Sequence, residues 1–123
     1  MIVGEVKPSR EALIRIVLKG TANQTVELDA VVDTGFTDYI TVSKHLADEL
    51  GLRYRESMIY ELANGEVDMF DLYEGRVVWN GQWRDVVLSV ADGGPLVGMA
   101  LMHGCRLTID IVDGGRVQIR PLG

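Results

Sequence analysis

Residues 30–36 read Ala30-Val31-Val32-Asp33-Thr34-Gly35-Phe36, and the rest of the fold is expected to form around this stretch. An apolar, β-prone run leads directly to an acid, a hydroxyl and a glycine. It predicts a strand that becomes apolar on both faces as it enters the core and carries Asp33 at its end. A charge in such a place is costly unless it is hydrogen-bonded or used, and acids in such surroundings cluster at functional sites. Asp33 is therefore the first candidate for chemistry.

The composition is that of one globular domain, which we expect to span residues 1–123. Hydrophobic residues make up 47% of the chain and charged residues 24%, which argues against disorder. The net charge of −6 and the lack of any Lys or Arg cluster argue against nucleic acid or an anionic membrane as a partner. The single cysteine, Cys105, suits a reducing compartment. Without a signal-peptide pattern or a membrane-length apolar run, a cytoplasmic protein is expected.

Short strand patterns separated by turn signals indicate an all-β domain. Two Asn-Gly pairs, Asn64-Gly65 and Asn80-Gly81, each predict a β-hairpin. A short helix is predicted over residues 44–50, with Ser43 as its N-cap, and a second helical piece over 99–103. The expected strands cover residues 1–6, 12–19, 25–32, 39–42, 55–63, 66–73, 76–79, 82–90, 106–112 and 116–119.

The chain resembles the retropepsin-like aspartic proteases of clan AA. Their active-site signature is two apolar residues followed by Asp-Thr-Gly, as in Val31 to Gly35. Their second signature is two apolar residues and a glycine before a short helix, as in Leu96 to Gly98, and the Asn64-Gly65 hairpin lies between the two, where the family has its flap. The small stand-alone prokaryotic type is especially similar. Its motifs match Asp33–Phe36, Val97–Met99, Leu107–Asp110 and Gly114-Gly115.

The resemblance implies an all-β, retropepsin-like acid-protease half-barrel with one or two short helices. It implies an aspartic endopeptidase that needs neither metal nor cofactor and acts on peptides or proteins. The reaction uses two carboxylates, but the chain holds one Asp-Thr-Gly, so a homodimer is expected to share one site with an Asp33 from each subunit. The implied residues are Asp33, Thr34 and Gly35 for catalysis, Phe36, Leu62, Ala63, Asn64 and Gly65 for substrate binding, and Leu96, Val97 and Gly98 for support of the site.

The chain departs from the retroviral members of this family at three positions. Phe36 and Thr37 stand where those proteins have Ala and Asp after the signature. Met99 replaces an Arg that helps to tie the viral subunits together. These departures bear on the strength of the dimer and on substrate access, and Phe36 could narrow a pocket beside the two acids.

Two other functions stay open: a non-catalytic peptide- or protein-binding module with the same fold, and an enzyme that cuts only a fused or dedicated partner. Asp38 could form a within-chain acid pair, as in a glycosidase, but is better interpreted as a solvated loop residue. A zinc site needs about four ligands. We therefore interpret His45 as a surface residue, His103 as a helix-end residue and Cys105 as a core thiol.

Aromatic and methionine side chains are expected to pack in the core or on sheet faces. An alternative role in lining a peptide groove is open for Tyr60 and Met69. The set comprises Tyr54, Met58, Tyr60, Met69, Tyr73, Trp79 and Trp83.

Overall fold

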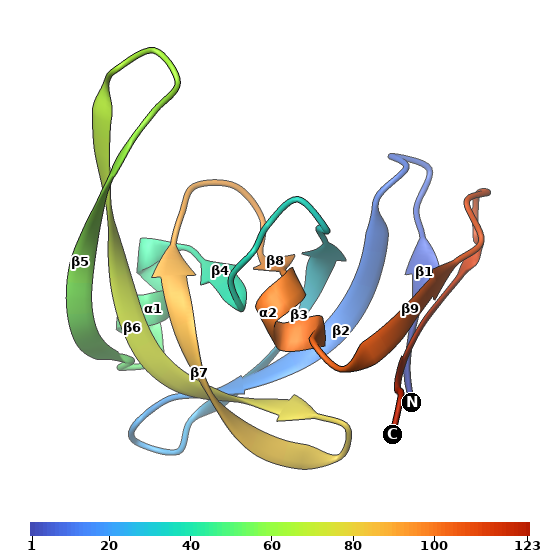
Figure 1. Ribbon diagram of the computed structural model, residues 1–123. Coiled ribbons are helices and arrows are strands. Elements are labelled where there is room, and N and C mark those ends of the chain that lie inside the picture. The colour runs from blue at the N-terminus through green and yellow to red at the C-terminus, as the bar shows by residue number, and fades with distance from the viewer.

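The computed structural model describes the backbone of residues 1–123 and all side chains except that of Tyr60. The described chain is mostly strand, with two short helices (Figure 1), which confirms the all-β prediction. None of the helices described is long and apolar enough to cross a membrane. The elements are β1 Ile2–Val6, β2 Ala12–Lys19, β3 Thr25–Val32, β4 Ile40–Val42, α1 Lys44–Glu49, β5 Arg53–Glu61, β6 Val67–Trp79, β7 Gln82–Val90, β8 Leu96–Val97, α2 Met99–Met102, β9 Cys105–Ile109 and β10 Arg116–Pro121.

The strands form one sheet that curls back on itself. Their order is β5-β6-β7-β4-β8-β3-β2-β1-β10-β9, and β6 also pairs with β2 at Leu18↔Val77 and Lys19↔Arg76. This second pairing closes the sheet into a partial barrel. The two ends of the chain lie close together because β1 pairs with β10 (Figure 1).

The core lies inside the curl, where alternate residues of the strands meet. Ile14, Ile16 and Leu18 of β2 are almost fully buried, as their alternation predicts. They pack with residues such as Leu88 of β7 and Leu101 of α2. Burying each such aliphatic side chain contributes about 1.5–3 kcal/mol to the stability of the fold. The core therefore fixes the position of the strand ends that carry the polar residues.

Helix α1 begins at the predicted residue, Lys44, and ends at Glu49, one residue before the predicted end. The Ser43 hydroxyl accepts a hydrogen bond of 3.1 Å from the Leu46 amide, and Gly51 has a φ of +59°. Hydrogen bonds to Asp48 and then to Tyr73 raise the pKa of Lys44 above its ordinary value. The cap and this charge pair together define a helix of less than two turns.

Both Asn-Gly hairpins are confirmed, with different turns. Asn80 and Gly81 both have positive φ, +52° and +80°. Positive φ at both central residues is typical of a two-residue type I′ turn, whose twist matches that of the flanking strands. At the other hairpin only Gly65 has positive φ, and its amide donates to the Leu62 carbonyl at 2.9 Å. That loop is therefore a three-residue turn with a glycine bulge. Its hairpin, β5–β6, projects well beyond the body of the protein (Figure 1).

Several predicted strand boundaries are wrong, and the largest differences lie in β6 and β9. Residues 66–73 and 76–79 belong to one strand, β6, which runs through Gly75 without a break. A β-carbon on Gly75 would lie 2.8 Å from Leu88 Cδ1, so this glycine serves close packing rather than a turn. Strand β9 ends at Ile109 and not at Val112, because the following loop turns to bond β1, with the Gly114 amide donating to the Val6 carbonyl at 2.9 Å.

The aromatic and methionine residues differ in how much of each side chain is exposed to solvent. Tyr73 and Trp79 are buried, as predicted. Met58 and Met69 lie on strands of the projecting hairpin and are 43% and 62% exposed, so they are on its faces and not in the core. The side chain of Tyr60 lies outside the described residues.

The two remaining aromatic residues pack on sheet faces. Tyr54 meets the ring of Tyr73 edge to face, with centroids 5.7 Å apart. Trp83 lies under the Lys19 ammonium group at 4.7 Å, a cation–π contact. Both are more than one-third exposed, which places them at the margin of the core.

Candidate active site

Asp33 follows the last residue of β3 and lies beside the second signature. Strand β3 pairs in parallel with β8, so that Val31 is opposite Leu96 and Val32 is opposite Val97. The Asp33 amide continues this ladder by donating to the Val97 carbonyl at 2.9 Å. Two segments about sixty residues apart in sequence are thus adjacent at the point where the carboxylate leaves the sheet.

The Asp33 carboxylate is half-buried and held by its own loop. Its Oδ1 accepts a hydrogen bond of 2.8 Å from the Gly35 amide. The Asp33 carbonyl accepts a second bond, of 3.2 Å, from the Phe36 amide. Bonds from N–H groups to an ionised carboxylate are among the stronger hydrogen bonds in proteins. The loop therefore orients the acid while Thr34 and Gly35 stay exposed at its tip.

The residue after β8 must be small because the acid-bearing loop lies against it. A β-carbon on Gly98 would stand 2.2 Å from the Asp38 carbonyl oxygen and 2.5 Å from Phe36 Cδ2. The φ of Gly98 is −108°, which other residues adopt readily. Close packing of two backbones, rather than an unusual conformation, therefore requires this glycine.

Helix α2 supplies the donors that secure the loop from the other side. The Met99 amide donates to the Phe36 carbonyl at 2.8 Å, and the Ala100 amide donates to the Asp38 carbonyl at 3.2 Å. One residue earlier, the Gly98 amide donates to the Tyr39 carbonyl at 2.9 Å. The first amides of a helix lack partners within it, and here the loop carbonyls satisfy them.

Thr41 is a supporting residue that the sequence analysis did not identify. It is buried in β4, and its Oγ1 accepts a hydrogen bond of 2.9 Å from the Leu96 amide. This bond ties β4 to β8 where only Ile40 and Val97 pair across the backbone. The feature of the sequence that could have identified Thr41 is a hydroxyl side chain between two apolar residues, Ile40 and Val42.

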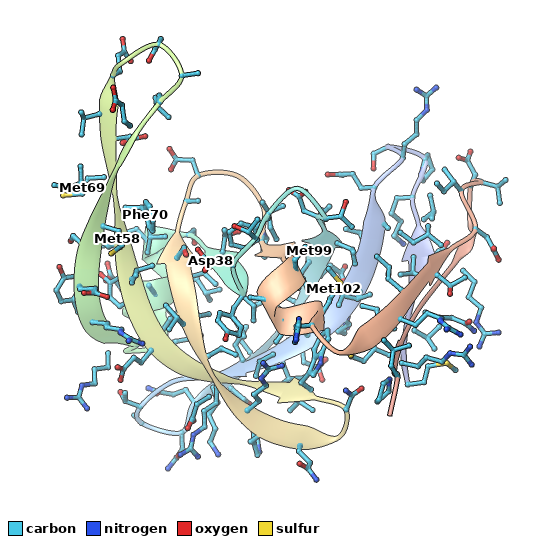
Figure 2. The ribbon with its side chains drawn as sticks, in the orientation of Figure 1. Asp38, Met58, Met69, Phe70, Met99 and Met102 are labelled. Atoms are coloured by element: carbon cyan, nitrogen blue, oxygen red, sulfur yellow. The ribbon has the colours of Figure 1, made fainter. Side chains whose placement is uncertain are left out.

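The expected substrate-binding residues of the flap lie at the tip of the β5–β6 hairpin. Leu62, Ala63, Asn64 and Gly65 are all exposed, and the tip stands away from the Asp33 loop (Figure 1). Below the tip the strands alternate, so that Met58 pairs with Phe70 and Ile59 pairs with Met69. Figure 2 shows Phe70 and Met69 on opposite sides of the hairpin. The structure therefore does not bring the tip and Asp33 together within one chain.

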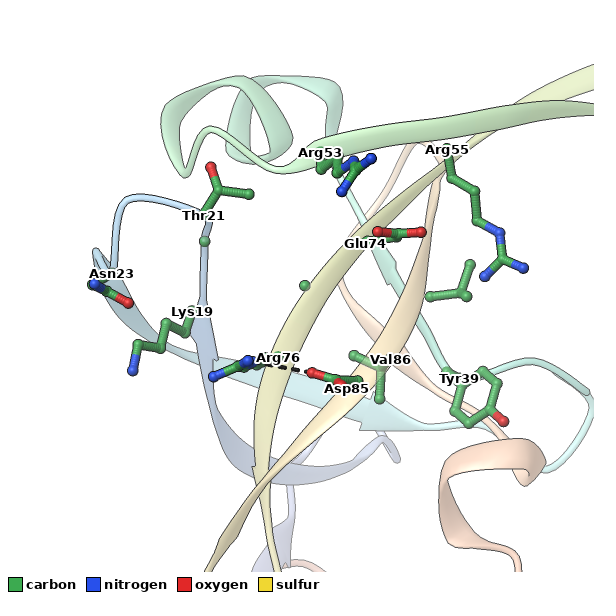
Figure 3. Close-up of a pocket in the computed structure, with 13 residues that line it drawn as sticks. Lys19, Thr21, Asn23, Tyr39, Arg53, Arg55, Glu74, Arg76, Asp85 and Val86 are labelled. Carbon is green, nitrogen blue, oxygen red and sulfur yellow. Dashed lines mark hydrogen bonds and ion pairs between the residues drawn. The ribbon is translucent and has the colours of Figure 1, made fainter.

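A hollow of about 580 Å³ lies elsewhere, on the face of β6 and β7 shown in Figure 3. Its charged lining includes Arg53, Arg55 and Glu74, with an ion pair of 3.0 Å between Arg76 and Asp85. Exposed pairs of this kind contribute little to stability or binding. The lining contains none of the predicted site residues, so this hollow is separate from the candidate site.

The other candidates from the sequence do not form one group, although His103 and Cys105 both border a hollow next to Thr34. Asp38 is exposed on the loop, and His45 is exposed on α1, 3.8 Å from Glu49. His103 caps the end of α2, and Cys105 is half-buried against the core. Among the side chains that the structure describes, no group of three His, Cys, Asp or Glu residues could hold a metal ion.

Comparison with known families finds a match over most of the chain. A family model described as aspartyl protease matches residues 18–103. The match begins at the end of β2 and extends past α2, and it includes Asp33, the projecting hairpin and Gly98. No curated protein matches the chain.

Proposed function

Because the chain belongs to the aspartyl protease family, we propose that it is an aspartic endopeptidase whose catalytic carboxylate is that of Asp33. The observation that carries the proposal is the hydrogen bond from the Gly35 amide to Asp33 Oδ1, in a loop secured by Gly98 and α2. A surface turn needs no such support. The family's chemistry needs an acid held in a defined orientation, and this loop supplies it.

The second carboxylate would come from another copy of the chain. Peptide hydrolysis by this route needs one acid to take a proton from water and another to polarise the carbonyl group. Asp38 is exposed, and its backbone carbonyl is bonded to α2, so the loop that carries it serves as support. A homodimer in which two Asp33 loops meet on a twofold axis supplies both carboxylates from the same residue. No other acid in the chain is then needed.

In this mechanism the two carboxylates share one proton, since like charges so close cannot both be ionised. The ionised Asp33 removes a proton from water, which attacks the scissile carbonyl carbon. The protonated one donates to the carbonyl oxygen, and a proton then passes to the leaving amine as the C–N bond breaks. Thr34 braces the two loops against each other, and Gly35 allows their close approach.

The projecting hairpin would act as the flap. Its tip, Leu62 to Gly65, is exposed and stands away from Asp33, as expected of a cover that closes when substrate arrives. An extended peptide would add β-type hydrogen bonds to the hairpin and to the wall near Phe36. The apolar Met58 and Phe70 share one face of the hairpin and suit apolar substrate side chains.

The test is cleavage of a mixed peptide library from acidic to neutral pH by the purified protein and by Asp33→Asn. We expect the wild type to cleave and the variant to be inactive, because the amide keeps the shape and the Oδ1 acceptor but cannot take up the proton. Equal cleavage by both proteins would refute the proposal. Binding of peptides by both, with cleavage by neither and no affinity for a hydroxyl-containing transition-state analogue, would instead support a non-catalytic module.

A further inference from the structure

Arg84 of β7 is a charged residue on a strand face that is otherwise apolar towards the core. Alternate residues of a strand lie on one face, so Arg84 shares a face of β7 with Val86 and Leu88, which are 5% and 0% exposed. Its partner across the sheet, Val77 of β6, is also fully buried. A partly buried guanidinium group in such a position is costly unless other groups satisfy it.

The first contact of Arg84 is with the end of α2. Its Nη1 donates a hydrogen bond of 3.2 Å to the carbonyl oxygen of Leu101, a residue that is fully buried. The last carbonyls of a helix have no partner within the helix, and an arginine side chain can serve as their donor. Arg84 thus attaches α2 to β7, at the end of the helix opposite to the amides that bond the Asp33 loop.

The second contact of Arg84 is with Tyr39, in the segment that leads from the Asp33 loop to β4. The guanidinium carbon lies over the Tyr39 ring, 5.6 Å from its centroid, which is within the range of a cation–π contact. The backbone carbonyl of Tyr39 accepts a hydrogen bond of 2.9 Å from the Gly98 amide. One side chain therefore contacts both parts of the support of the site, the helix that donates hydrogen bonds and the segment that accepts them.

The guanidinium group of Arg84 is not shared with an acid. None of the described side chains forms an ion pair with it, whereas Arg15, Arg55 and Arg76 each pair with an exposed carboxylate. A planar guanidinium can donate a hydrogen bond and stack on an aromatic ring at the same time, which an ammonium group cannot do. Both contacts of Arg84 are thus with the elements that secure Asp33.

We propose that Arg84 is a positioning residue for Asp33, which holds α2 and the Tyr39 segment at the spacing that the Asp33 loop requires. The proposal rests on the proposed function, since the orientation of Asp33 affects the rate only if Asp33 takes part in the reaction. Arg84 acts through α2, whose first amides bond the carbonyls of the loop. Its loss should therefore shift the acid without removing any group that touches the substrate.

The experiment measures peptide cleavage by the wild type, Arg84→Met, Arg84→Lys and the control Arg76→Met. Methionine keeps an unbranched apolar stem without a donor, and lysine keeps a charged donor. Arg84→Met should lower kcat per folded molecule about tenfold or more, because a misplaced catalytic group loses rate steeply. KM should stay nearly unchanged, since neither contact of Arg84 is with the β5–β6 hairpin.

The other two variants identify the cause of the loss. Arg84→Lys should recover part of the kcat, because its ammonium group can still donate to the Leu101 carbonyl. Arg76→Met removes an arginine of β6 that pairs with the exposed Asp85, and it should match the wild type. A kcat per folded molecule in Arg84→Met equal to that of the wild type would overturn the proposal, because Arg84 would then serve stability alone.

Hydrogen exchange gives a readout that does not depend on activity. The amides of residues 98–100 bond the carbonyls of residues 36–39, and in Arg84→Met they should exchange about tenfold faster, while the amides of β2 should keep the wild-type rate. Arg76→Met should change neither. Wild-type exchange in a folded Arg84→Met would overturn the proposal. If Arg84→Met does not fold, Arg84→Gln, whose side chain is shorter, replaces it in both measurements.

The outcomes separate this proposal from the proposed function. A wild type that cleaves peptides, with an unchanged kcat in Arg84→Met, would leave the enzyme intact and refute the positioning role. A wild type that cleaves no peptide would refute the enzyme. Faster exchange of residues 98–100 in Arg84→Met would then still support Arg84 as the residue that holds the loop, and unchanged exchange would refute both proposals.

Discussion

Gly98 lies so close to Asp38 that a β-carbon on the glycine would stand 2.2 Å from the Asp38 carbonyl oxygen. No side chain tolerates such a contact. The backbone after β8 and the loop that carries Asp33 are therefore packed directly against each other. The Met99 and Ala100 amides then bond that loop. The position of Asp33 therefore depends on a glycine that is sixty-five residues away in sequence.

Gly98→Ala should displace the loop and lower both stability and activity. Forcing a methyl group into a packed site costs about 1–3 kcal/mol, and a misplaced catalytic group loses rate steeply. Thermal unfolding and peptide cleavage measure the two effects. Gly94→Ala is the control, because nothing lies within 4 Å of a β-carbon at Gly94, and it should change neither. Full activity in Gly98→Ala would show that the loop does not need this packing.

Thr41→Val should destabilise the protein by about 1–3 kcal/mol, because it leaves the Leu96 amide without its acceptor. The valine side chain has nearly the same shape as threonine, so packing around the buried residue is preserved. Urea unfolding gives the difference in the free energy of unfolding. Thr41→Ser keeps the hydroxyl and should retain the hydrogen bond. If Thr41→Val were as stable as the wild type, the bond between β4 and β8 would be unimportant.

Gly65→Ala and Gly81→Ala form a matched pair at two hairpin turns. Both glycines have positive φ, +84° and +80°, with open space around a β-carbon. The backbone strain should therefore cost each variant about 1–2 kcal/mol. If the β5–β6 hairpin is the flap, only Gly65→Ala should also lower kcat/KM. Equal kcat/KM in the two variants would argue that the tip takes no part in the reaction.

Mixing wild type with Asp33→Asn tests whether the site is shared. If each subunit supplies one carboxylate, mixed dimers are inactive, and a ninefold excess of the variant should reduce wild-type activity to roughly a tenth after subunit exchange. Activity that is indifferent to added Asp33→Asn would mean that one chain contains the whole site.

Local patterns identified most of the elements that surround the site. Strands β2, β3 and β7 have the predicted bounds, because alternation of apolar and polar residues is a local property. The prediction of separate strands over 66–73 and 76–79 is wrong, because β6 continues through Gly75, whose small size is needed for packing against Leu88 on another strand. The prediction could not decide between the core and a sheet face for Met58 and Met69, because hydrophobicity alone does not tell that a hairpin extends beyond the core.

By itself, the sequence determined that a strand ends at an acid, a hydroxyl and a glycine, and that two Asn-Gly turns follow, because strand alternation and turn conformation depend on neighbouring residues. Only the tertiary structure decided that Gly98 is squeezed against Asp38, that Thr41 bonds Leu96, and that an apolar hollow opens beside Thr34. These are contacts between segments distant in the chain, and they exist only once the sheet has curled and placed β8 between β3 and β4.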